Sequence, residues 1–356
     1  MTDDYKKRFE ELITLAAKEK ASDLHLSVGR HPTLRISGEL TALVKYPVLT
    51  AADTEGMIFS ILTSEEKSEF LKQKTFDFSY AYEDKARFRV NIFFQRGFIS
   101  ASFRLIPVEV LGLSDLNLPP ILADFARKEQ GFFLVVGPTG HGKSTTLASM
   151  IDIINRERAE HIITVEDPIE YLFTQDKSII DQREIGRDAM NFASALRSMF
   201  REDINVAMIG EMRDPETISA AVTAAETGHL VLSSLHTNSA SQTIDRIIDT
   251  FAPGQQNQIR TQLAGSLLGI FSQRLVPRVS GGRIPAYELL IANTPVRNLI
   301  RENKIHEIDL YIETSSEAGM ISLNQSFIDL VQKGEVTMET ARAYSLNAHG
   351  LENLMR

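Results

Sequence analysis

The spacing of hydrophobic residues changes along the chain, and each change indicates a different type of structure. Residues 4–20 carry apolar side chains at helical spacing, which predicts an amphipathic helix. Polar and apolar residues then nearly alternate, which predicts half-buried strands of one antiparallel sheet. These segments are 23–27, 33–36, 76–82, 88–94 and 99–106. A helical stretch over 50–72 interrupts them, so residues 1–106 are expected to form a small α+β domain.

Residues 107–120 hold three prolines and little helical periodicity, and we interpret them as a linker. Beyond the linker, apolar runs alternate with helical patterns. Continuous apolar runs are typical of parallel strands that helices cover on both faces. These runs lie at 131–136, 162–165, 206–209 and 229–235. From about residue 255 the pattern is mostly helical, so residues 121–356 are expected to form an α/β domain with a helical C-terminal segment.

Composition narrows the class of protein. The net charge of −9 argues against nucleic acid as the main partner. No apolar run approaches the ~20 residues of a membrane span, and the N-terminus is charged, unlike a signal peptide. The absence of cysteine excludes a disulfide framework and a thiolate zinc site. We therefore expect a cytoplasmic protein.

The most specific motif is Gly-Pro-Thr-Gly-His-Gly-Lys-Ser at 137–144, which matches G-x-x-x-x-G-K-[ST] between a predicted strand and a predicted helix. In such a loop the backbone N–H groups surround phosphates. Lys143 would reach the β- and γ-phosphates, and the Ser144 hydroxyl would hold Mg²⁺. At His141 an exposed loop side chain is favoured over a phosphate contact. The expected nucleotide-binding residues are Gly137, Pro138, Thr139, Gly140, His141, Gly142, Lys143, Ser144 and Thr145.

Carboxylates follow two of the apolar runs, at the strand ends where open α/β sheets bind their ligands. Glu166-Asp167 follows the first, with Glu170 close behind, and Glu211 follows the second. Gly210 stands where a Walker B strand usually has aspartate. These carboxylates are candidates for holding a metal ion and positioning a water molecule.

Histidines and arginines supply further candidates. His229 and His236 flank one strand, and either a structural role or a γ-phosphate contact is open for them. Arg87, Arg89 and Arg104 lie outside the nucleotide domain, where they are either surface residues or groups that reach a neighbouring subunit's phosphates.

Together with these residues, several segments give the chain a family resemblance over nearly its full length. They are SDLHLS, RISGEL, ARFRVN, FRLIP, GPTGHGKSTT, ITVEDPIEY, ALRSMFRED, IGEMRD, TGHLVLSSLHTNSA and PVRNLIRE. The chain resembles the secretion ATPase superfamily of type II/IV machines, and within it the pilus retraction ATPases. The resemblance implies a PAS-like N-terminal domain, a RecA-like ATPase domain and a homohexameric ring.

The same resemblance implies roles for individual residues. It makes Arg89 and Arg104 arginines that act on a neighbouring subunit, and His229 a nucleotide sensor. Glu166 and Glu211 would position metal and water, so that Ser144, Glu166 and Glu211 hold Mg²⁺, partly through water. Two positions depart from the family, which usually has serine in place of His141 and Pro-Asp in place of Ile204-Asn205.

The implied function is an ATP-hydrolysing motor that powers pilus retraction and twitching motility. It would act at the inner face of the cytoplasmic membrane on a membrane platform protein, with an accessory retraction ATPase as a further partner and no nucleic acid. Three alternatives stay open: the accessory ATPase itself, a non-hydrolytic nucleotide switch and a nucleic-acid motor. The apolar helix face of Val296, Leu299 and Ile300 is either a transmission element or simple core packing.

Overall fold

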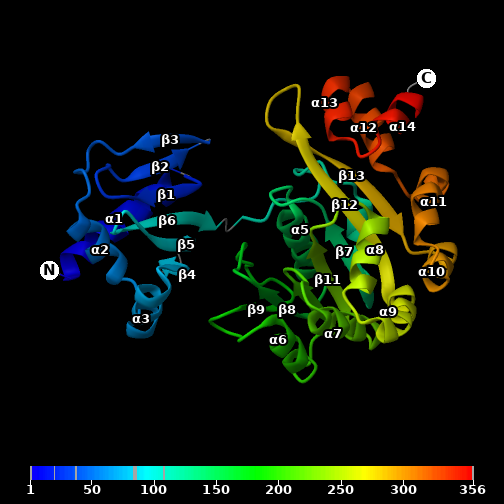
Figure 1. The fold of residues 1–356 in the computed structure, drawn as a ribbon, viewed down its shortest axis with the longest axis horizontal. Coiled ribbons are helices and arrows are strands. Elements are labelled where there is room, and N and C mark those ends of the chain that lie inside the picture. Colours follow the sequence, from blue (N-terminus) through cyan, green and yellow to red (C-terminus); the bar gives the residue numbers. More distant parts are fainter. Residues whose placement is uncertain (1, 20, 37, 83–85, 107–108, 355–356) are drawn as a thin grey trace. The chain divides into compact units, whose positions relative to one another are not determined.

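The computed structural model describes residues 2–19, 21–36, 38–82, 86–106 and 109–354 (Figure 1). Residue 20, at the end of the first expected helix, and residues 107–108, in the expected linker, lie outside this set. The chain divides into two compact units. One comprises Met1–Glu109 and Pro168–Leu172, and the other comprises Val110–Asp167 and Phe173–Arg356.

The first unit is a six-stranded sheet with helices packed on one face. Every strand pair is antiparallel, in the order β3-β2-β1-β6-β5-β4. The strands are β1 (Asp23–Leu26), β2 (Thr33–Ile36), β3 (Glu39–Ala42), β4 (Thr75–Tyr82), β5 (Ala86–Gln95) and β6 (Phe98–Ile106). The helices are α1 (Thr2–Lys18), α2 (Ala51–Phe59) and α3 (Ser64–Gln73). The sequence pattern missed β3, because all four of its residues are exposed and none is needed for the core.

Alternation along β5 shows how this sheet is built. Phe88, Val90 and Ile92 are fully buried in a core that includes Phe9 of α1. Successive side chains of a strand point to opposite faces. The residues between the apolar ones, Arg89 among them, therefore lie on the face away from this core.

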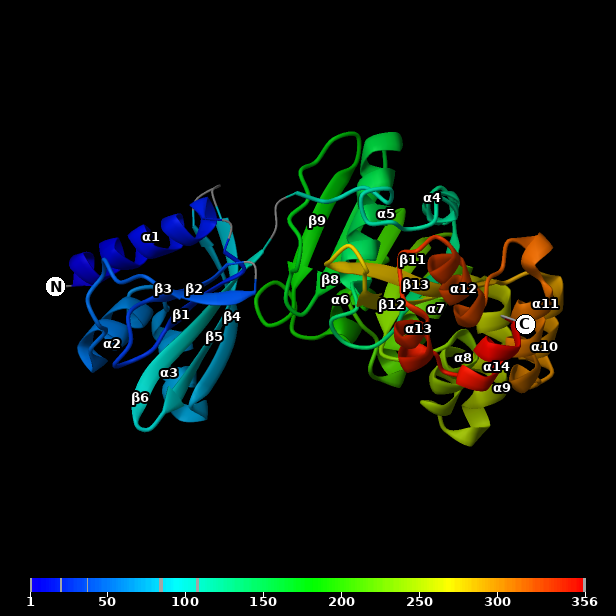
Figure 2. The same ribbon diagram turned by 90° about the horizontal axis from the view of Figure 1, so that it is seen from above.

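The second unit is a seven-stranded sheet with helices on both faces (Figures 1 and 2). Its order is β13-β12-β7-β11-β10-β8-β9, and only the β12–β13 pair is antiparallel. The strands are β7 (Gly131–Val136), β8 (His161–Glu166), β9 (Ile179–Glu184), β10 (Val206–Ile209), β11 (Leu230–Leu235), β12 (Leu267–Pro277) and β13 (Arg283–Ile291).

Both faces of this sheet are apolar, as expected of covered parallel strands. In β7, Phe132, Leu134 and Val136 belong to one hydrophobic cluster, while Phe133 and Val135 belong to another. The helices are α4 (Ile121–Ala126), α5 (Lys143–Glu157), α6 (Phe192–Met199), α7 (Pro215–Glu226), α8 (Ala240–Asp249) and α9 (Pro253–Ser266). Within the described residues, no helix of the chain is long and apolar enough to cross a membrane.

The C-terminal segment from about residue 255 is mostly helical, as predicted, but it contains the β12–β13 hairpin, which the sequence pattern missed. Helix α9 ends at Ser266 and β12 starts at Leu267 without a turn between them, so no local signal marks the change. The helices that follow are α10 (Thr294–Arg301), α11 (Ile308–Thr314), α12 (Leu323–Gln332), α13 (Met338–Tyr344) and α14 (Ala348–Leu354). Short 3-10 turns lie at Ile305–Glu307 and Ser316–Ala318.

Candidate active site

The phosphate loop lies between β7 and α5, as its sequence predicted. Three of its glycines have positive φ angles: Gly137 at 145°, Gly140 at 78° and Gly142 at 82°. A Cβ atom on Gly137 would also lie 2.3 Å from the backbone oxygen of Gln273 in β12, so no side chain fits there. The glycines therefore allow both the left-handed turns and the close approach of the loop to β12.

Lys143, the first residue of α5, is buried and turned toward its own loop. Its Nζ donates to the backbone oxygens of Gly137 and Pro138, each at 3.0 Å. The same atom lies 3.3 Å from Nδ1 of His236, which directly follows β11. The ammonium group thus stands at the carboxyl edge of the sheet, inside the loop that would surround phosphates.

The two predicted carboxylates end neighbouring strands at this same edge. Glu166 is the last residue of β8 and is buried, and its Oε1 accepts from the Thr164 hydroxyl at 2.7 Å. Glu211 lies just after β10. Its Oε1 pairs with Arg213, and its Oε2 lies 3.3 Å from His236 Nε2. That Oε2 is buried and makes no hydrogen bond to the described residues, which leaves an acceptor for a water molecule or a cation.

The structure separates the two histidines. His236 follows β11 at the carboxyl edge, beside Lys143 and Glu211. His229 precedes β11 at the amino edge, where its Nδ1 contacts the Ala224 oxygen at 3.0 Å and its ring packs edge-on against Phe200. Six strand residues, roughly 20 Å, separate the two edges. Within this subunit the expected sensor His229 does not reach the phosphate loop, and His236 does.

The departure at Ile204-Asn205 also lies at the amino edge. Asn205 Oδ1 accepts from the backbone N–H of His161 at 2.9 Å, and the Asn205 backbone pairs with His161 and Leu230. Ile204 is buried in the core. These residues join the starts of β8, β10 and β11. The aspartate that the family usually has at the place of Asn205 would therefore lie at the amino edge and not at the carboxyl edge.

The residues at the carboxyl edge fit Mg²⁺ held together with a nucleotide. Within the described residues, no group of three or more His, Asp or Glu side chains forms a metal cage. Mg²⁺ does not need one, because it is usually bound by one or two carboxylates together with phosphates and water. The Ser144 hydroxyl and the unbonded Oε2 of Glu211 are suitable oxygen ligands, and Glu166 lies on the neighbouring strand.

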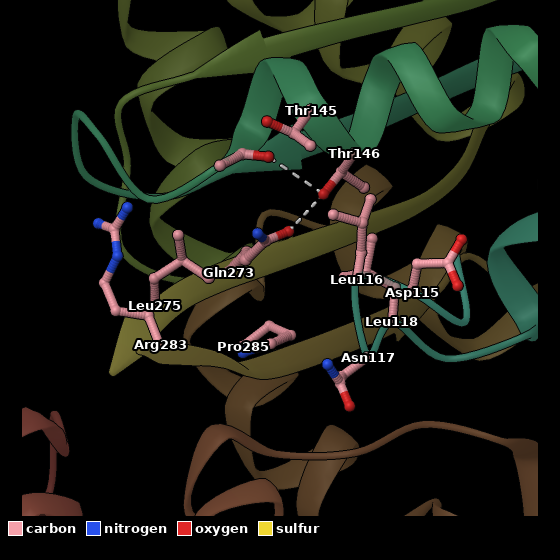
Figure 3. Close-up of a pocket in the computed structure, with 11 residues that line it drawn as sticks. Asp115, Leu116, Asn117, Leu118, Thr145, Thr146, Gln273, Leu275, Arg283 and Pro285 are labelled. Carbon is pink, nitrogen blue, oxygen red and sulfur yellow. Dashed lines mark hydrogen bonds between the residues drawn. The ribbon is translucent and has the colours of Figure 1, made fainter. Parts of the chain in front are cut away.

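A cavity of about 340 Å³ adjoins the first turn of α5 (Figure 3). Its wall includes Thr145 and Thr146, and the turn that precedes α4 supplies Leu116, Asn117 and Leu118. Arg283 of β13 stands at its other side (Figure 3). The sequence pattern predicted a linker here and gave no sign of the cavity. The turn becomes part of a cavity only because β12 and β13 lie beside the phosphate loop.

The predicted arginines lie on the first unit. Arg89 of β5 and Arg104 of β6 stand directly opposite each other, and both are exposed. Arg104 Nε donates to Oδ1 of Asp23 at 3.0 Å, and the Asp23 side chain is only 7% exposed. Like charges directly opposite one another in a sheet repel. The pair is therefore a suitable place for an anion.

The segment at 295–302 forms α10 and the residue after it. Val296 and Ile300 are fully buried, and Leu299 packs against the same core. Arg297 also takes part in the packing, because its guanidinium donates to the backbone oxygens of Gly265, Leu267 and Ala292. The apolar face thus packs in the core, and the exposed side of the helix carries Asn298 and Arg301.

A phosphate loop, a buried lysine and strand-end carboxylates on a parallel sheet define a RecA-like P-loop ATPase domain, here following a PAS-like α+β domain. The family described as Type II/IV secretion system protein matches residues 93–343. The chain therefore belongs to this family and is a nucleotide-binding ATPase, which confirms the family and the activity predicted from the sequence.

Individual proteins of the family are similar to this chain along almost its whole length. Over 332 residues the chain is 42% identical to the type IV pilus retraction ATPase PilT of Pseudomonas aeruginosa, covering 93% of this chain and 96% of that protein. It is 36% identical over 350 residues to the type IV pilus ATPase PilU of the same organism, covering 98% and 91%. A crystal structure of the pilus retraction motor PilT with bound ADP matches with a TM-score of 0.90 and 45% identity, covering 97% of this chain and 98% of that one.

Proposed function

We propose that this chain is a homohexameric motor that hydrolyses ATP to power type IV pilus retraction. The observation that carries the hydrolytic part is the contact series from Lys143 through His236 to Glu211 beside the phosphate loop. The retraction part is supported by similarity to the pilus retraction motor PilT along almost the whole of both chains.

The chemistry assigned to each residue follows from its position. Lys143 would exchange its two backbone carbonyls for phosphate oxygens, which are stronger acceptors for an ammonium group. Glu211 would orient the attacking water through its free Oε2. Ser144, Glu166 and Glu211 would hold Mg²⁺, in part through water, and the ion would neutralise charge on the phosphates.

His236 is the candidate for reporting the state of the nucleotide. Its Nδ1 faces Lys143 and the Thr139 hydroxyl at 3.3 and 3.1 Å, and its Nε2 faces Glu211. A change in the position of Lys143 would therefore shift the His236 ring, which contacts Glu211. We assign the sensing role to His236 in place of His229.

The nucleotide itself would extend from the phosphate loop into the cavity beside α5. Arg89 and Arg104 would contribute from another subunit, because arginines supplied by a neighbour stabilise charge on a transferring phosphoryl group. Asp23 holds Arg104 by its Nε and leaves the terminal nitrogens of the guanidinium for an anion. We place the PAS-like domain over 1–106 and the ATPase domain over 121–356, joined by the segment 107–120, whose residues from Val110 onward pack with the ATPase unit.

We further propose that the motor works in the cytoplasm, at the inner face of the cytoplasmic membrane. There it would act on a pilus platform protein, with an accessory retraction ATPase as a second partner and no nucleic acid. The net charge of −9 supports the exclusion of nucleic acid. The alternative that the chain is itself the accessory ATPase is disfavoured by its higher identity to PilT than to PilU.

The deciding experiment measures ATPase activity and particle mass of the purified chain, together with pilus retraction in cells that lack it. An active hexamer that restores retraction supports the motor. An inactive monomer would support the alternative of a nucleotide-binding switch. An active hexamer that does not restore retraction would indicate that the chain drives a different machine of the same family.

A further inference from the structure

Strand β12 continues past the end of its neighbour β7. The two strands pair up to Val136 opposite Ser272, whereas β12 runs on to Pro277. Residues 273–277 therefore present an open strand edge where β7 has turned away into the phosphate loop. An open edge leaves backbone N–H and C=O groups that need other partners.

Leu275 exposes such an N–H group. In the β12–β13 ladder it stands opposite Pro285, and proline has no N–H to exchange. The two residues are therefore a pair without mutual hydrogen bonds, and the backbone groups of such a pair point away from the partner strand. The Leu275 N–H donates instead to Nδ1 of His141, at 2.9 Å.

The backbone of the phosphate loop is held to the same hairpin. The Gln273 side chain donates from Nε2 to the His141 oxygen at 2.9 Å. Its Oε1 accepts from the Thr146 hydroxyl at 2.7 Å (Figure 3). Arg283 of β13 donates to the Gly140 oxygen at 3.3 Å. These contacts fix the backbone on each side of the ring, so the His141 imidazole completes the attachment of the loop.

We propose that His141 is a positioning residue, which pins the phosphate loop to the open edge of β12 and thereby strengthens nucleotide binding. The proposal rests on the assignment of residues 137–145 as the ATP site. A loop that is already held in its binding geometry loses less conformational freedom when phosphate binds. The sequence pattern favoured an exposed side chain at this position, because nothing local reveals the strand edge beside it.

The attachment requires a neutral imidazole, because a doubly protonated ring has no lone pair to accept an N–H. Burial and the nearby cations Arg274 of β12, Arg283 of β13 and Lys143 lower the pKa of His141 below its ordinary value. The contact is therefore intact at neutral pH. It is lost when the pH falls through this lowered pKa, and nucleotide affinity should fall with it.

The test compares three variants of the full-length chain: His141→Asn, His141→Gln and His141→Ala. The asparagine oxygen occupies nearly the place of Nδ1, whereas the glutamine oxygen lies one bond further out, nearer the place of Nε2. The dissociation constant of a fluorescent ADP and the kcat and KM for ATP are measured between pH 5.5 and 8. Melting temperatures without nucleotide report on folding.

At pH 8 we expect His141→Ala and His141→Gln to weaken ADP binding by about fivefold to tenfold, the scale of one lost hydrogen bond. His141→Asn should bind within about twofold of wild type. Wild-type affinity should fall when the pH is taken below the lowered pKa of His141, while that of His141→Asn should change less. Equal affinities of the Asn and Gln variants at pH 8 would overturn the proposal, even if the alanine variant does not fold.

Lys143→Ala separates this inference from the site assignment on which it rests. If Lys143→Ala loses ADP binding while the histidine variants bind normally, the ATP site stands and the role of His141 is wrong. If Lys143→Ala binds ADP as wild type does, the assignment of the loop fails, and the inference fails with it.

Discussion

Nζ of Lys143 lies 3.3 Å from Nδ1 of His236, although 93 positions separate the two residues in the chain. An ammonium group can only donate, so a hydrogen bond between the two requires Nδ1 to accept and places the imidazole proton on Nε2. Nε2 lies 3.3 Å from Glu211 Oε2, and no hydrogen bond joins these two atoms. Lys143 of the phosphate loop, His236 after β11 and Glu211 after β10 thus meet in one series of contacts.

This relationship predicts which histidine matters for turnover. His236→Ala should slow ATP hydrolysis by about one to two decades, because it removes the group between Lys143 and Glu211. His229→Ala is the matched control at the other end of β11 and should affect stability more than kcat. Steady-state ATPase assays on both folded variants decide the matter. A larger loss of kcat in His229→Ala would restore His229 as the sensor.

Glu211 is expected to act on water and not on nucleotide binding. Glu211→Gln should bind ATP nearly as tightly as wild type but turn over at least about a hundredfold more slowly. Lys143→Ala should instead weaken triphosphate binding, because it removes the cation that faces the phosphates. Binding is measured by equilibrium titration and turnover by phosphate release.

The control for the carboxylate is Glu216→Gln, an exposed residue on α7 that pairs with Arg197 on the surface. It should leave both quantities unchanged. Wild-type hydrolysis by Glu211→Gln would move the role to Glu166, the other carboxylate at this edge.

Arginines that act on a neighbouring subunit have an effect that depends on assembly. Arg104→Ala should abolish most of the ATPase activity of the ring. Mixing it with Lys143→Ala subunits should restore part of it, because a mixed ring contains interfaces in which both halves are intact. Arg30→Ala, another arginine of the first unit, is the control and should keep full activity. Mixed rings shown by mass to form but inactive at every ratio would refute action between subunits.

Glu288 should make stability depend on pH. Burial raises its pKa from 4.5 to about 7, against the opposing hydrogen bond from the Ala240 N–H. Between these two values the folded state keeps a proton that the unfolded state releases. Stability therefore falls as the pH rises through that range, by on the order of 3 kcal/mol.

Glu288→Gln keeps the acceptor oxygen but stays neutral, so it should lose less stability than wild type between pH 5 and pH 8. Melting temperatures of both proteins across this range provide the measurement. Glu216→Gln, on the surface, should follow the wild-type curve. Parallel curves for wild type and Glu288→Gln would contradict the prediction.

Helix α10 allows hydrolysis to be separated from mechanical work. Ile300 is fully buried, so Ile300→Asn should destabilise the fold by about 3 kcal/mol or more and cannot report on transmission. The exposed Asn298 and Arg301 form the surface through which this helix could act. The double variant Asn298→Ala, Arg301→Ala should form a hexamer that hydrolyses ATP but does not retract pili. Normal retraction by this variant would mean that α10 serves only to pack the core.

Local sequence was sufficient for the elements whose physics is local. The phosphate loop needs its glycines for positive φ angles, and the continuous apolar runs of β7, β8, β10 and β11 are typical of covered parallel strands. The carboxylates at Glu166 and Glu211 followed from the same runs, because parallel strands end at one edge. The family resemblance then indicated the ATPase activity.

Tertiary structure decided everything that depends on which edge or which neighbour a residue meets. His229 and His236 differ in sequence only by the side of β11 on which they lie, yet one meets Phe200 and the other Lys143. His141 accepts the Leu275 N–H because β12 extends beyond the end of β7. This extension depends on pairing between strands more than a hundred residues apart. Such contacts arise from sheet order and strand length, which no periodicity within a segment encodes.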